Sequence, residues 1–241
     1  MTAPNSVIDT AMVMAAGHGT RMRPLTNDTP KALIKVGGKP MVDHAIDRLK
    51  DAGIKRIIVN IHAFADQMRA HLDARKDDSI IISDESGELL ETGGGIKKAL
   101  PLLGDKPIIT HNCDSIWVEG MGKTLPRLLN AFDADKMDAL LVLAVTANIV
   151  GDVSRGDFTM DPLGRIEWRE PASVAPFMFT GVQIIKPQLF AAVEETAFST
   201  AKIWTPLMDK GTAYGLRHDG VWMHVGTPGA LEEAEDFLRE L

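Results

Sequence analysis

Apolar runs and amphipathic segments alternate along the first part of the chain, up to about residue 148. A short apolar run is typical of a buried strand, and apolar residues spaced three and four positions apart predict a helix. The alternation therefore predicts an α/β fold whose mainly parallel central sheet is covered by helices on both faces. The predicted strands span 12–16, 54–61, 80–83, 107–110 and 139–146, and the predicted helices span 41–52, 63–72, 95–103 and 124–132.

After about residue 148 the pattern changes to shorter segments. Short strands are predicted at 158–160, 166–168 and 177–185, and a last helix at 228–240. Successive strands without intervening helices favour an antiparallel arrangement. No internal repeat, low-complexity tract or flexible linker is visible in the sequence. We therefore expect a single domain over 1–241, in which two lobes at about 10–115 and 116–241 share one sheet and a cleft.

Composition and charge narrow the function. The 241 residues are 45% hydrophobic and 24% charged, which is ordinary for a globular protein with a sizeable core. The net charge of −7 argues against a general surface for nucleic acids or anionic membranes. A single cysteine excludes an intrachain disulfide and agrees with a reducing compartment. No signal peptide or membrane span is visible, so we expect a cytoplasmic protein with small-molecule partners.

The most informative segment is 12–31, where an apolar run enters a loop with two glycines and then basic residues; it reads AAGHGTRMRPLT at 15–26 and PK at 30–31. Glycines let backbone N–H groups approach phosphate oxygens, and small alanines leave room for a flat base. Arg21 provides a planar fork and Lys31 a point charge for phosphate oxygens. Such cations suit a triphosphate whose α-phosphorus is attacked. We assign Ala15, Ala16, Gly17, Gly19 and Thr20 to nucleotide binding and Arg21 and Lys31 to catalysis.

A tight turn with solvated basic residues would explain the glycines but not Arg21 and Lys31 together. The whole string resembles the signature of sugar-1-phosphate nucleotidylyltransferases, enzymes that join a nucleoside triphosphate to a sugar 1-phosphate and release pyrophosphate. The resemblance extends over nearly the whole chain. It implies a Rossmann-like (GT-A-like) three-layer sandwich with a mainly parallel central sheet. It also implies a nucleotide-binding first lobe and a smaller, antiparallel, sugar-binding second lobe.

Asn112, Cys113 and Asp114 follow the strand predicted at 107–110. Ligands bind at the carboxyl ends of strands in open α/β sheets, and a carboxylate there can bind a divalent metal that bridges phosphate oxygens. Taken alone, such an aspartate is more often a helix cap or a turn residue. The family, however, carries a similar Asn-x-Asp element whose aspartate holds Mg²⁺. The resemblance thus implies Asp114 as a metal ligand and Asn112 beside the sugar phosphate, with no catalytic role for Cys113.

Residues 91–95, with the sequence Glu-Thr-Gly-Gly-Gly, lie between a predicted strand and a predicted helix. Three consecutive glycines indicate a close backbone approach, unless the segment is a mobile loop. We predict a turn that contacts the nucleotide through Glu91, Thr92, Gly93 and Gly94. Residues 90–95 are especially similar to those of uridylyltransferases acting on N-acetylmuramate 1-phosphate, whereas mannose-1-phosphate guanylyltransferases more often carry Leu-Gly-Thr-Ala-Gly. Nearby, His62 either contacts the base or ribose or caps the following helix.

Segments of the second lobe resemble those that hold the sugar phosphate in the family. They contain Arg155, Gly156 and Asp157, and Thr180 and Gly181. Glu170-Pro171 is similar to the family's Glu-Lys-Pro element, whose glutamate hydrogen-bonds sugar hydroxyls. Because the lysine is missing here, Arg155 is a candidate for the cationic contact.

Residues 222–227, Trp-Met-His-Val-Gly-Thr, resemble the closing motif Trp-x-Asp-x-Gly-Thr, whose aspartate is the family's second metal ligand. His224 occupies that position in this chain. Imidazole is a poorer ligand for Mg²⁺ than a carboxylate and suits transition metals better. The resemblance therefore implies Mg²⁺ on Asp114 and His224, with Mn²⁺ or Co²⁺ as alternatives.

The resemblance implies a nucleotidyltransferase, and our first choice is uridylyl transfer from UTP to N-acetylmuramate 1-phosphate, as in peptidoglycan recycling. The sugar-phosphate oxygen would attack the α-phosphorus in line, without a covalent enzyme intermediate or a general base. One alternative is guanylyl transfer to mannose 1-phosphate, and another is cytidylyl transfer to an alcohol phosphate. From a different class, the chain could be a nucleotide-sugar-binding regulator in which His224 marks the loss of catalysis.

Overall fold

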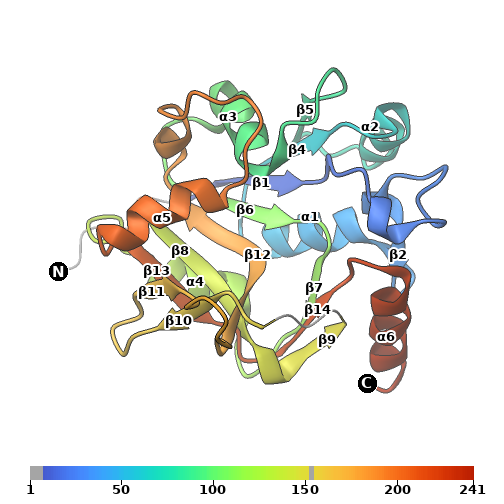
Figure 1. Cartoon of the computed structure of the whole chain (residues 1–241). Coiled ribbons are helices and arrows are strands. Elements are labelled where there is room, and N and C mark those ends of the chain that lie inside the picture. The colour runs from blue at the N-terminus through green and yellow to red at the C-terminus, as the bar shows by residue number, and fades with distance from the viewer. Residues whose placement is uncertain (1–7, 152–154) are drawn as a thin grey trace.

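The computed structural model describes residues 8–151 and 155–241, and nine strands of this part form one sheet between two layers of helices (Figure 1). The parallel part of the sheet has the order β6–β1–β4–β5. These strands span Ile108–Asn112, Thr10–Met14, Arg56–Ile61 and Ile80–Asp84. Helices α1 (Met41–Asp51), α2 (Ala65–Ala74) and α3 (Glu91–Leu103) connect them. The predicted α/β class and parallel centre are confirmed.

The second half of the chain extends the same sheet. β12 (Phe177–Ile185) runs antiparallel to β6 on one side and to β8 (Ala139–Val145) on the other. β10 (Phe158–Met160) and β11 (Ile166–Trp168) add an antiparallel edge, and β13 (Ala213–Arg217) pairs with β8 in parallel. The three short strands predicted in this half occur at the predicted residues. β12 therefore joins the second half of the chain to β6 of the parallel sheet.

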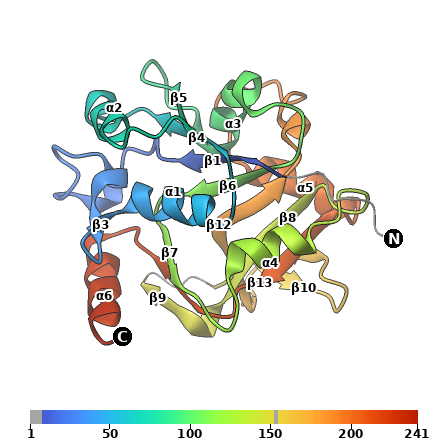
Figure 2. The same ribbon diagram turned by 180° about the vertical axis from the view of Figure 1, so that it is seen from behind.

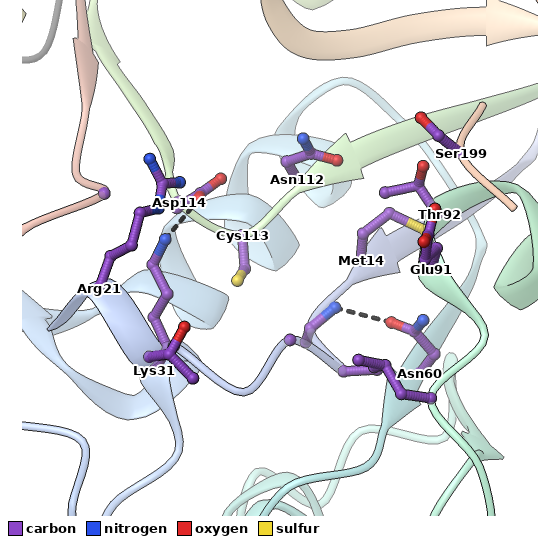
Figure 3. A pocket seen from close by; sticks show the side chains of 17 residues that line it. Met14, Arg21, Lys31, Asn60, Glu91, Thr92, Asn112, Cys113, Asp114 and Ser199 are labelled. Carbon is purple, nitrogen blue, oxygen red and sulfur yellow. Dashed lines mark hydrogen bonds and ion pairs between the residues drawn. The ribbon is translucent and has the colours of Figure 1, made fainter. Parts of the chain in front are cut away.

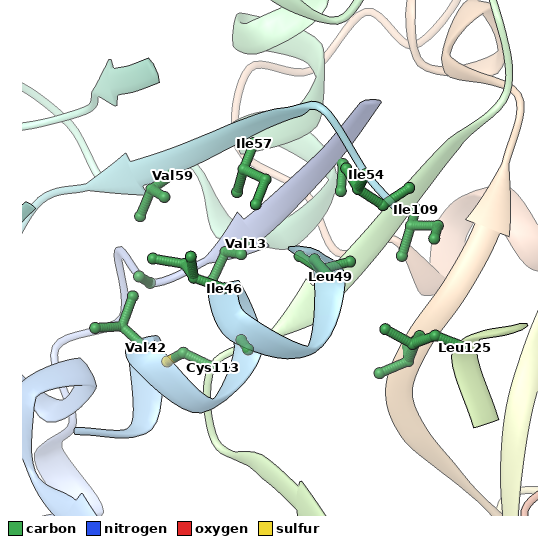
Figure 4. Packing of buried hydrophobic residues seen from close by; sticks show 14 of the residues in the cluster. Val13, Val42, Ile46, Leu49, Ile54, Ile57, Val59, Ile109, Cys113 and Leu125 are labelled. Atoms are coloured by element: carbon green, nitrogen blue, oxygen red, sulfur yellow. The ribbon is translucent and has the colours of Figure 1, made fainter. Parts of the chain in front are cut away.

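Alternate residues of the central strands supply two separate cores. On one face, Val13 and Ile109 pack with Ile46 and Leu49 of α1 (Figure 4), and Figure 2 shows α1 and α4 (Thr124–Ala131) covering this face. On the other, Met12 and Ile108 pack with residues of α3 and α5 (Ala201–Asp209). Each fully buried side chain of this kind contributes about 2 kcal/mol. The strand ends that form the cavity described below are therefore held from both faces.

A smaller third region closes one end of the molecule. β14 (Val221–His224) pairs with β7 (Ser115–Val118) and β9 (Ile149–Gly151) in a separate sheet. Helix α6 (Pro228–Arg239) follows, with proline in its first turn and the Thr227 side chain accepting a hydrogen bond from Ala230 N at 3.2 Å. The register pairs His224 with Ser115, so His224 lies one residue along from Asp114.

Short elements complete the fold. The hairpin of β2 (Lys35–Val36) and β3 (Lys39–Pro40) leads into α1. The 3₁₀ turns are η1 (Thr20–Met22), η2 (Lys31–Leu33), η3 (Thr146–Asn148) and η4 (Pro187–Phe190). None of the helices in 8–151 and 155–241 is long and apolar enough to cross a membrane.

Candidate active site

A cavity of about 420 Å³ opens where β1, β4 and β6 end. Ligands bind at this edge of open α/β sheets, because loops leave the strands there in diverging directions. The cavity brings together many residues that the sequence analysis assigned to function. They are Ala15, Ala16, Gly17, Gly19, Thr20, Arg21, Lys31, Glu91, Thr92, Asn112 and Asp114. Met14, Asn60, Leu89, Ser199 and Gly226 also line it, and none of these was assigned a role from the sequence.

One end of the cavity carries charge. Lys31 Nζ lies 2.6 Å from Asp114 Oδ2, and His224 Nε2 lies 3.7 Å from the same oxygen. Burial would raise the pKa of Asp114, but Lys31 and then His224 outweigh it and hold this pKa well below its usual range. Arg21 is exposed in η1 on the same side of the cavity (Figure 3). This end therefore offers two cations and one carboxylate to a phosphate group.

The backbone of the signature loop explains how Lys31 comes close. Gly19 has φ +64°, and a Cβ there would lie 2.8 Å from Lys31 Cβ. Thr26 Oγ1 donates to the Gly19 carbonyl oxygen at 2.8 Å and holds the loop closed. A side chain at residue 19 would be strained and would push Lys31 away. Gly19 thus serves the loop conformation and the placement of the cation at once.

Two buried polar side chains support the floor of the cavity. Asn60 Oδ1 accepts a hydrogen bond from Ala15 N at 2.7 Å, and Asn60 Nδ2 donates to Glu85 Oε1 at 2.9 Å. β1 consequently ends at Met14, two residues earlier than predicted, because Ala15 N–H bonds to a side chain. Glu85 is fully buried, and burial raises its pKa. Asn60 is the one polar residue in the apolar run at 57–61, and this was the sequence signal that could have indicated its role.

The predicted glycine turn is wrong, because α3 already begins at Glu91. The glycines lie within the helix, where neighbouring chain approaches closely. The N–H groups of Gly93 and Gly94 both approach the Phe198 carbonyl oxygen, at 2.7 and 3.1 Å. A Cβ on Gly94 would lie 2.1 Å from the Thr196 carbonyl oxygen, and one on Gly95 would lie 2.8 Å from Glu85 Oε1. Gly93 and Gly94 do not line the cavity, and their contact with the nucleotide stays a prediction.

Because residues 196–200 pack closely over the start of α3, Ser199 lies in the cavity wall. Phe198 N donates to the Leu90 carbonyl oxygen at 3.2 Å, and Thr200 N donates to Thr92 Oγ1 at 2.9 Å. Ser199 is therefore anchored on both sides, while its own side chain is exposed to the cavity (Figure 3). No motif around residue 199 signalled this role, because the contact joins segments about a hundred residues apart.

His62 does not line the cavity either. Its Nδ1 hydrogen-bonds to the Glu85 carbonyl oxygen at 2.5 Å, and its ring packs edge-on against His18 at 4.9 Å between centroids. The following helix α2 has no side-chain cap, so the predicted capping role is wrong. The contact of His62 with base or ribose stays a prediction.

The predicted sugar-phosphate residues of the second half occupy different places. Gly181 packs against Asn112, with φ +83° and room for no Cβ, and so supports a residue of the cavity wall. Thr180 Oγ1 donates to the Val142 carbonyl oxygen, and Asp157 Oδ2 accepts from Phe179 N. These contacts give Thr180 and Asp157 structural roles.

Three further predicted sugar-phosphate residues also lie outside the cavity wall. A Cβ on Gly156 would lie 2.1 Å from the Ala175 carbonyl oxygen, so this glycine permits a close backbone approach. Arg155 and Glu170 are exposed and do not line the cavity, so their contacts to the sugar phosphate stay predictions.

The donor set for a metal is small. Among the described residues, no group of three or more histidine, cysteine, aspartate and glutamate side chains is arranged to hold an ion. As metal ligands, Asp114 offers its carboxylate oxygens and His224 offers one imidazole nitrogen. Mg²⁺ is commonly bound by one or two carboxylates together with substrate phosphates and water, so these residues fit an ion that arrives with a nucleotide. Cys113 is not a candidate metal ligand, because burial raises the pKa of its thiol to about 12 and so disfavours the thiolate that would bind a metal.

Known proteins share this sequence and fold. A model of the MobA-like NTP transferase domain matches residues 11–154. An N-acetylmuramate α-1-phosphate uridylyltransferase from Caulobacter vibrioides is 44% identical over 95% of this chain and 97% of its own length. Another, from Neisseria meningitidis, is 36% identical over 93% and 96%. Mannose-1-phosphate guanylyltransferases match at lower identity, 26% and 34% for two from Drosophila species.

A solved structure supports the fold independently. UDP-glucose pyrophosphorylase from Acinetobacter baumanii superposes with a TM-score of 0.77 at 18% identity, over 95% of this chain and 92% of its own. The chain thus has the GT-A-like fold of the sugar nucleotidyltransferases.

Proposed function

The chain belongs to the MobA-like NTP transferase family, and we propose that it transfers the uridylyl group of UTP to N-acetylmuramate 1-phosphate. Members of this family with 44% and 36% identity carry that activity in their names, and they match almost end to end. The observation that carries the proposal is the charged end of the cavity. Two cations and Asp114 converge there beside a loop of small residues, as a triphosphate requires.

The proposed reaction is a direct displacement at phosphorus. An oxygen of the sugar 1-phosphate attacks the α-phosphorus of UTP, and the bond from that phosphorus to the oxygen bridging to the β-phosphate breaks. Pyrophosphate leaves with the electron pair, and UDP-sugar is formed. Because the attacking phosphate oxygen is already ionised, no general base is needed. Rate enhancement then depends on positioning and on charge stabilisation by fixed groups.

The roles of the residues follow from their positions. Arg21 would bind non-bridging phosphate oxygens through its planar fork, and Lys31 would neutralise charge on the α-phosphate and the leaving group. Lys31 is already paired with Asp114, so its ammonium group is held at the cavity wall before substrate binds. A divalent ion, held by Asp114 and His224 together with phosphate oxygens, would supply further neutralisation of the triphosphate. We propose Mg²⁺, with Mn²⁺ and Co²⁺ as alternatives.

The proposal also assigns places for the rest of the nucleotide. The small side chains of Ala15 and Ala16 leave a flat surface for the base, beside Asn60 and Leu89. Glu91 and Thr92, in the first turn of α3, lie opposite. We propose that the product enters peptidoglycan recycling and that the reaction takes place in the cytoplasm.

The test is a matrix of substrates. Purified protein is incubated with UTP, GTP or CTP and with N-acetylmuramate, N-acetylglucosamine or mannose 1-phosphate, each with Mg²⁺, Mn²⁺ or Co²⁺. Pyrophosphate release and the mass of the nucleotide sugar are measured, and the Lys31→Ala variant controls for contaminating activity. We expect UTP with N-acetylmuramate 1-phosphate to be the best pair. Turnover of GTP with mannose 1-phosphate instead would contradict the substrate proposal, and no turnover with any pair would favour a binding protein.

A further inference from the structure

A second cavity of about 180 Å³ adjoins the first and shares four wall residues with it. The shared wall consists of Met14, Thr92, Asn112 and Ser199. Beyond this wall the cavity extends between β6 and β12 of the sheet and α3 and α5 above it. None of the roles discussed so far uses the residues at its far end.

Two polar side chains at that far end occupy positions where a core would be apolar. Thr110 and Gln183 are neighbours in the sheet register and are only 3% and 1% exposed. The strand residues next to them on this face, Met12, Ile108 and Leu141, are hydrophobic. Burying polar groups without partners is costly. Both residues line the cavity, and no hydrogen bond within residues 8–151 and 155–241 uses Thr110 Oγ1 or Gln183 Nε2, so both atoms can bond to a ligand there.

The orientation of Gln183 determines what it can recognise. Its Oε1 accepts a hydrogen bond from Trp204 Nε1 at 2.9 Å. The carbonyl side of the amide is therefore occupied, and the Nε2 side remains as a donor for a ligand oxygen. Thr110 Oγ1 can accept from an N–H group or donate. The pair is complementary to an amide, whose carbonyl accepts and whose N–H donates.

The rest of the lining excludes charged groups. Phe179 and Trp204 pack edge-on with ring centroids 4.7 Å apart, and Ile96 completes the apolar wall. None of the described residues that line this cavity carries a charge. A carboxylate or ammonium group would lose its hydration here without gaining a counter-ion. A small, neutral group with one methyl and one amide satisfies both the polar and the apolar walls.

We propose that this second cavity binds the acetamido group of a 2-acetamido sugar 1-phosphate, with Gln183, Thr110 and Trp204 as specificity-determining residues. The inference rests on the proposed sugar-phosphate transfer and adds the group by which the sugar is selected. Asn112 stands between this cavity and Asp114, so a sugar beside Asn112 can place its phosphate at the charged end and its acetamido group in the neutral cavity. The carboxylate of a lactyl substituent stays outside.

The experiment compares two sugar 1-phosphates that differ only at carbon 2. One carries the acetamido group and the other a hydroxyl, and kcat/KM is measured for each with saturating UTP. Gln183→Leu and Thr110→Val remove the two polar partners. Thr10→Val is the matched control, because Thr10 is also a buried threonine, on β1 and away from both cavities. The KM for UTP is measured for every variant.

We expect the wild type to prefer the acetamido sugar, and each cavity variant to lower kcat/KM for it about tenfold, the scale of one net hydrogen bond. The kcat/KM for the hydroxyl sugar and the KM for UTP should change little, and Thr10→Val should resemble the wild type. A folding defect would lower kcat/KM equally for both sugars. An unchanged ratio of the two kcat/KM values, in a variant that still turns over substrate, therefore overturns the inference. A raised KM for UTP alone also overturns it and assigns the cavity to the base.

Failure of the two proposals can be told apart. If the wild type turns over both sugars equally, the acetamido cavity is wrong while the transferase function stands. If it turns over neither sugar with any nucleotide, the transferase function is wrong and the cavity proposal falls with it. Should Gln183→Leu not fold after Trp204 loses its partner, Thr110→Val decides alone, because that substitution preserves the shape of the side chain.

Discussion

The two cavities differ in charge and in what holds their side chains. At the charged end, Arg21 and Lys31 project from the 3₁₀ turns η1 and η2, and Arg21 is exposed. At the neutral end, Thr110 and Gln183 project from neighbouring strands and are almost fully buried. Removing a cation should therefore impair chemistry and leave the fold intact. Substitutions in the packed segments that support the cavities, such as the start of α3, should alter both the stability of the fold and the substrate selectivity.

The largest effect should come from the charged end. Arg21→Ala and Lys31→Ala should each reduce kcat about a hundredfold or more, the usual scale for removing an electrostatic stabiliser of a transition state. Both residues lie in short turns rather than in the core, so circular dichroism and the melting temperature should be close to wild type. Arg23→Ala and Lys35→Ala are matched controls, because both residues are exposed neighbours that do not line the cavity. Near-normal turnover by either cavity variant would remove that residue from the mechanism.

The packing beneath the cavities can be broken at Gly94. A valine there would place its Cβ about where the Thr196 carbonyl oxygen lies, so we expect Gly94→Val to destabilise the protein by about 3 kcal/mol or more. Nothing lies within 4 Å of a Cβ on Gly17, so Gly17→Ala is the stability control. Thermal or urea unfolding measures both. An unchanged stability of Gly94→Val would show that the 196–198 segment does not pack over α3 in solution.

His224 tests the expected metal position at the charged end. A carboxylate would offer Mg²⁺ hard oxygen ligands and a full negative charge, which a neutral imidazole lacks. We expect His224→Asp to lower the Mg²⁺ concentration for half-maximal rate several-fold, and the wild type to work at least as well with Mn²⁺ or Co²⁺. Metal titrations of both proteins at fixed UTP are the measurement. Identical titration curves would exclude His224 from metal binding, and Asp219 would be the next residue to test.

The smallest effect concerns Glu85 beneath the signature loop. Burial raises its pKa above the ordinary 4.5, so the folded state binds a proton that the unfolded state releases. Stability should therefore fall as pH rises from 4.5 through the raised pKa, and the penalty should persist above it. Glu85→Gln keeps an oxygen for Asn60 Nδ2 and removes this penalty. We expect a gain of up to about 3 °C in Tm at neutral pH, roughly 1 kcal/mol for a chain of this size.

The pH dependence provides the check on that prediction. The difference in Tm between Glu85→Gln and wild type should shrink as the pH is lowered through the raised pKa and vanish below 4.5, where Glu85 is protonated in both states. A difference that is constant with pH would mean that Glu85 is neutral throughout or pairs with another group. Turnover at pH 7 should be retained, since the hydrogen bond that orients Asn60 towards Ala15 is preserved.

Local pattern was sufficient for most of the fold. The strands at 158–160, 166–168 and 177–185 occur at the predicted residues, and α1 differs from its prediction by a single residue. The spacing of apolar residues shows which face of a helix or strand is buried, and this spacing can be read within one segment of the sequence. The start of α3 was missed because glycine disfavours helices in isolation, whereas here the close approach of 196–198 requires glycine inside one.

The sequence by itself pointed to the charged end of the site, because Arg21 and Lys31 stand out as two cations beside a glycine loop, and the family resemblance added Asp114 and His224. Only the tertiary structure decided what supports and extends that site. Asn60, Glu85 and Ser199 join it through contacts between segments far apart in the chain, and Thr110 meets Gln183 only because β12 pairs with β6. A buried polar residue has no local signature of its partner, since its partner is chosen by the packing of the whole sheet.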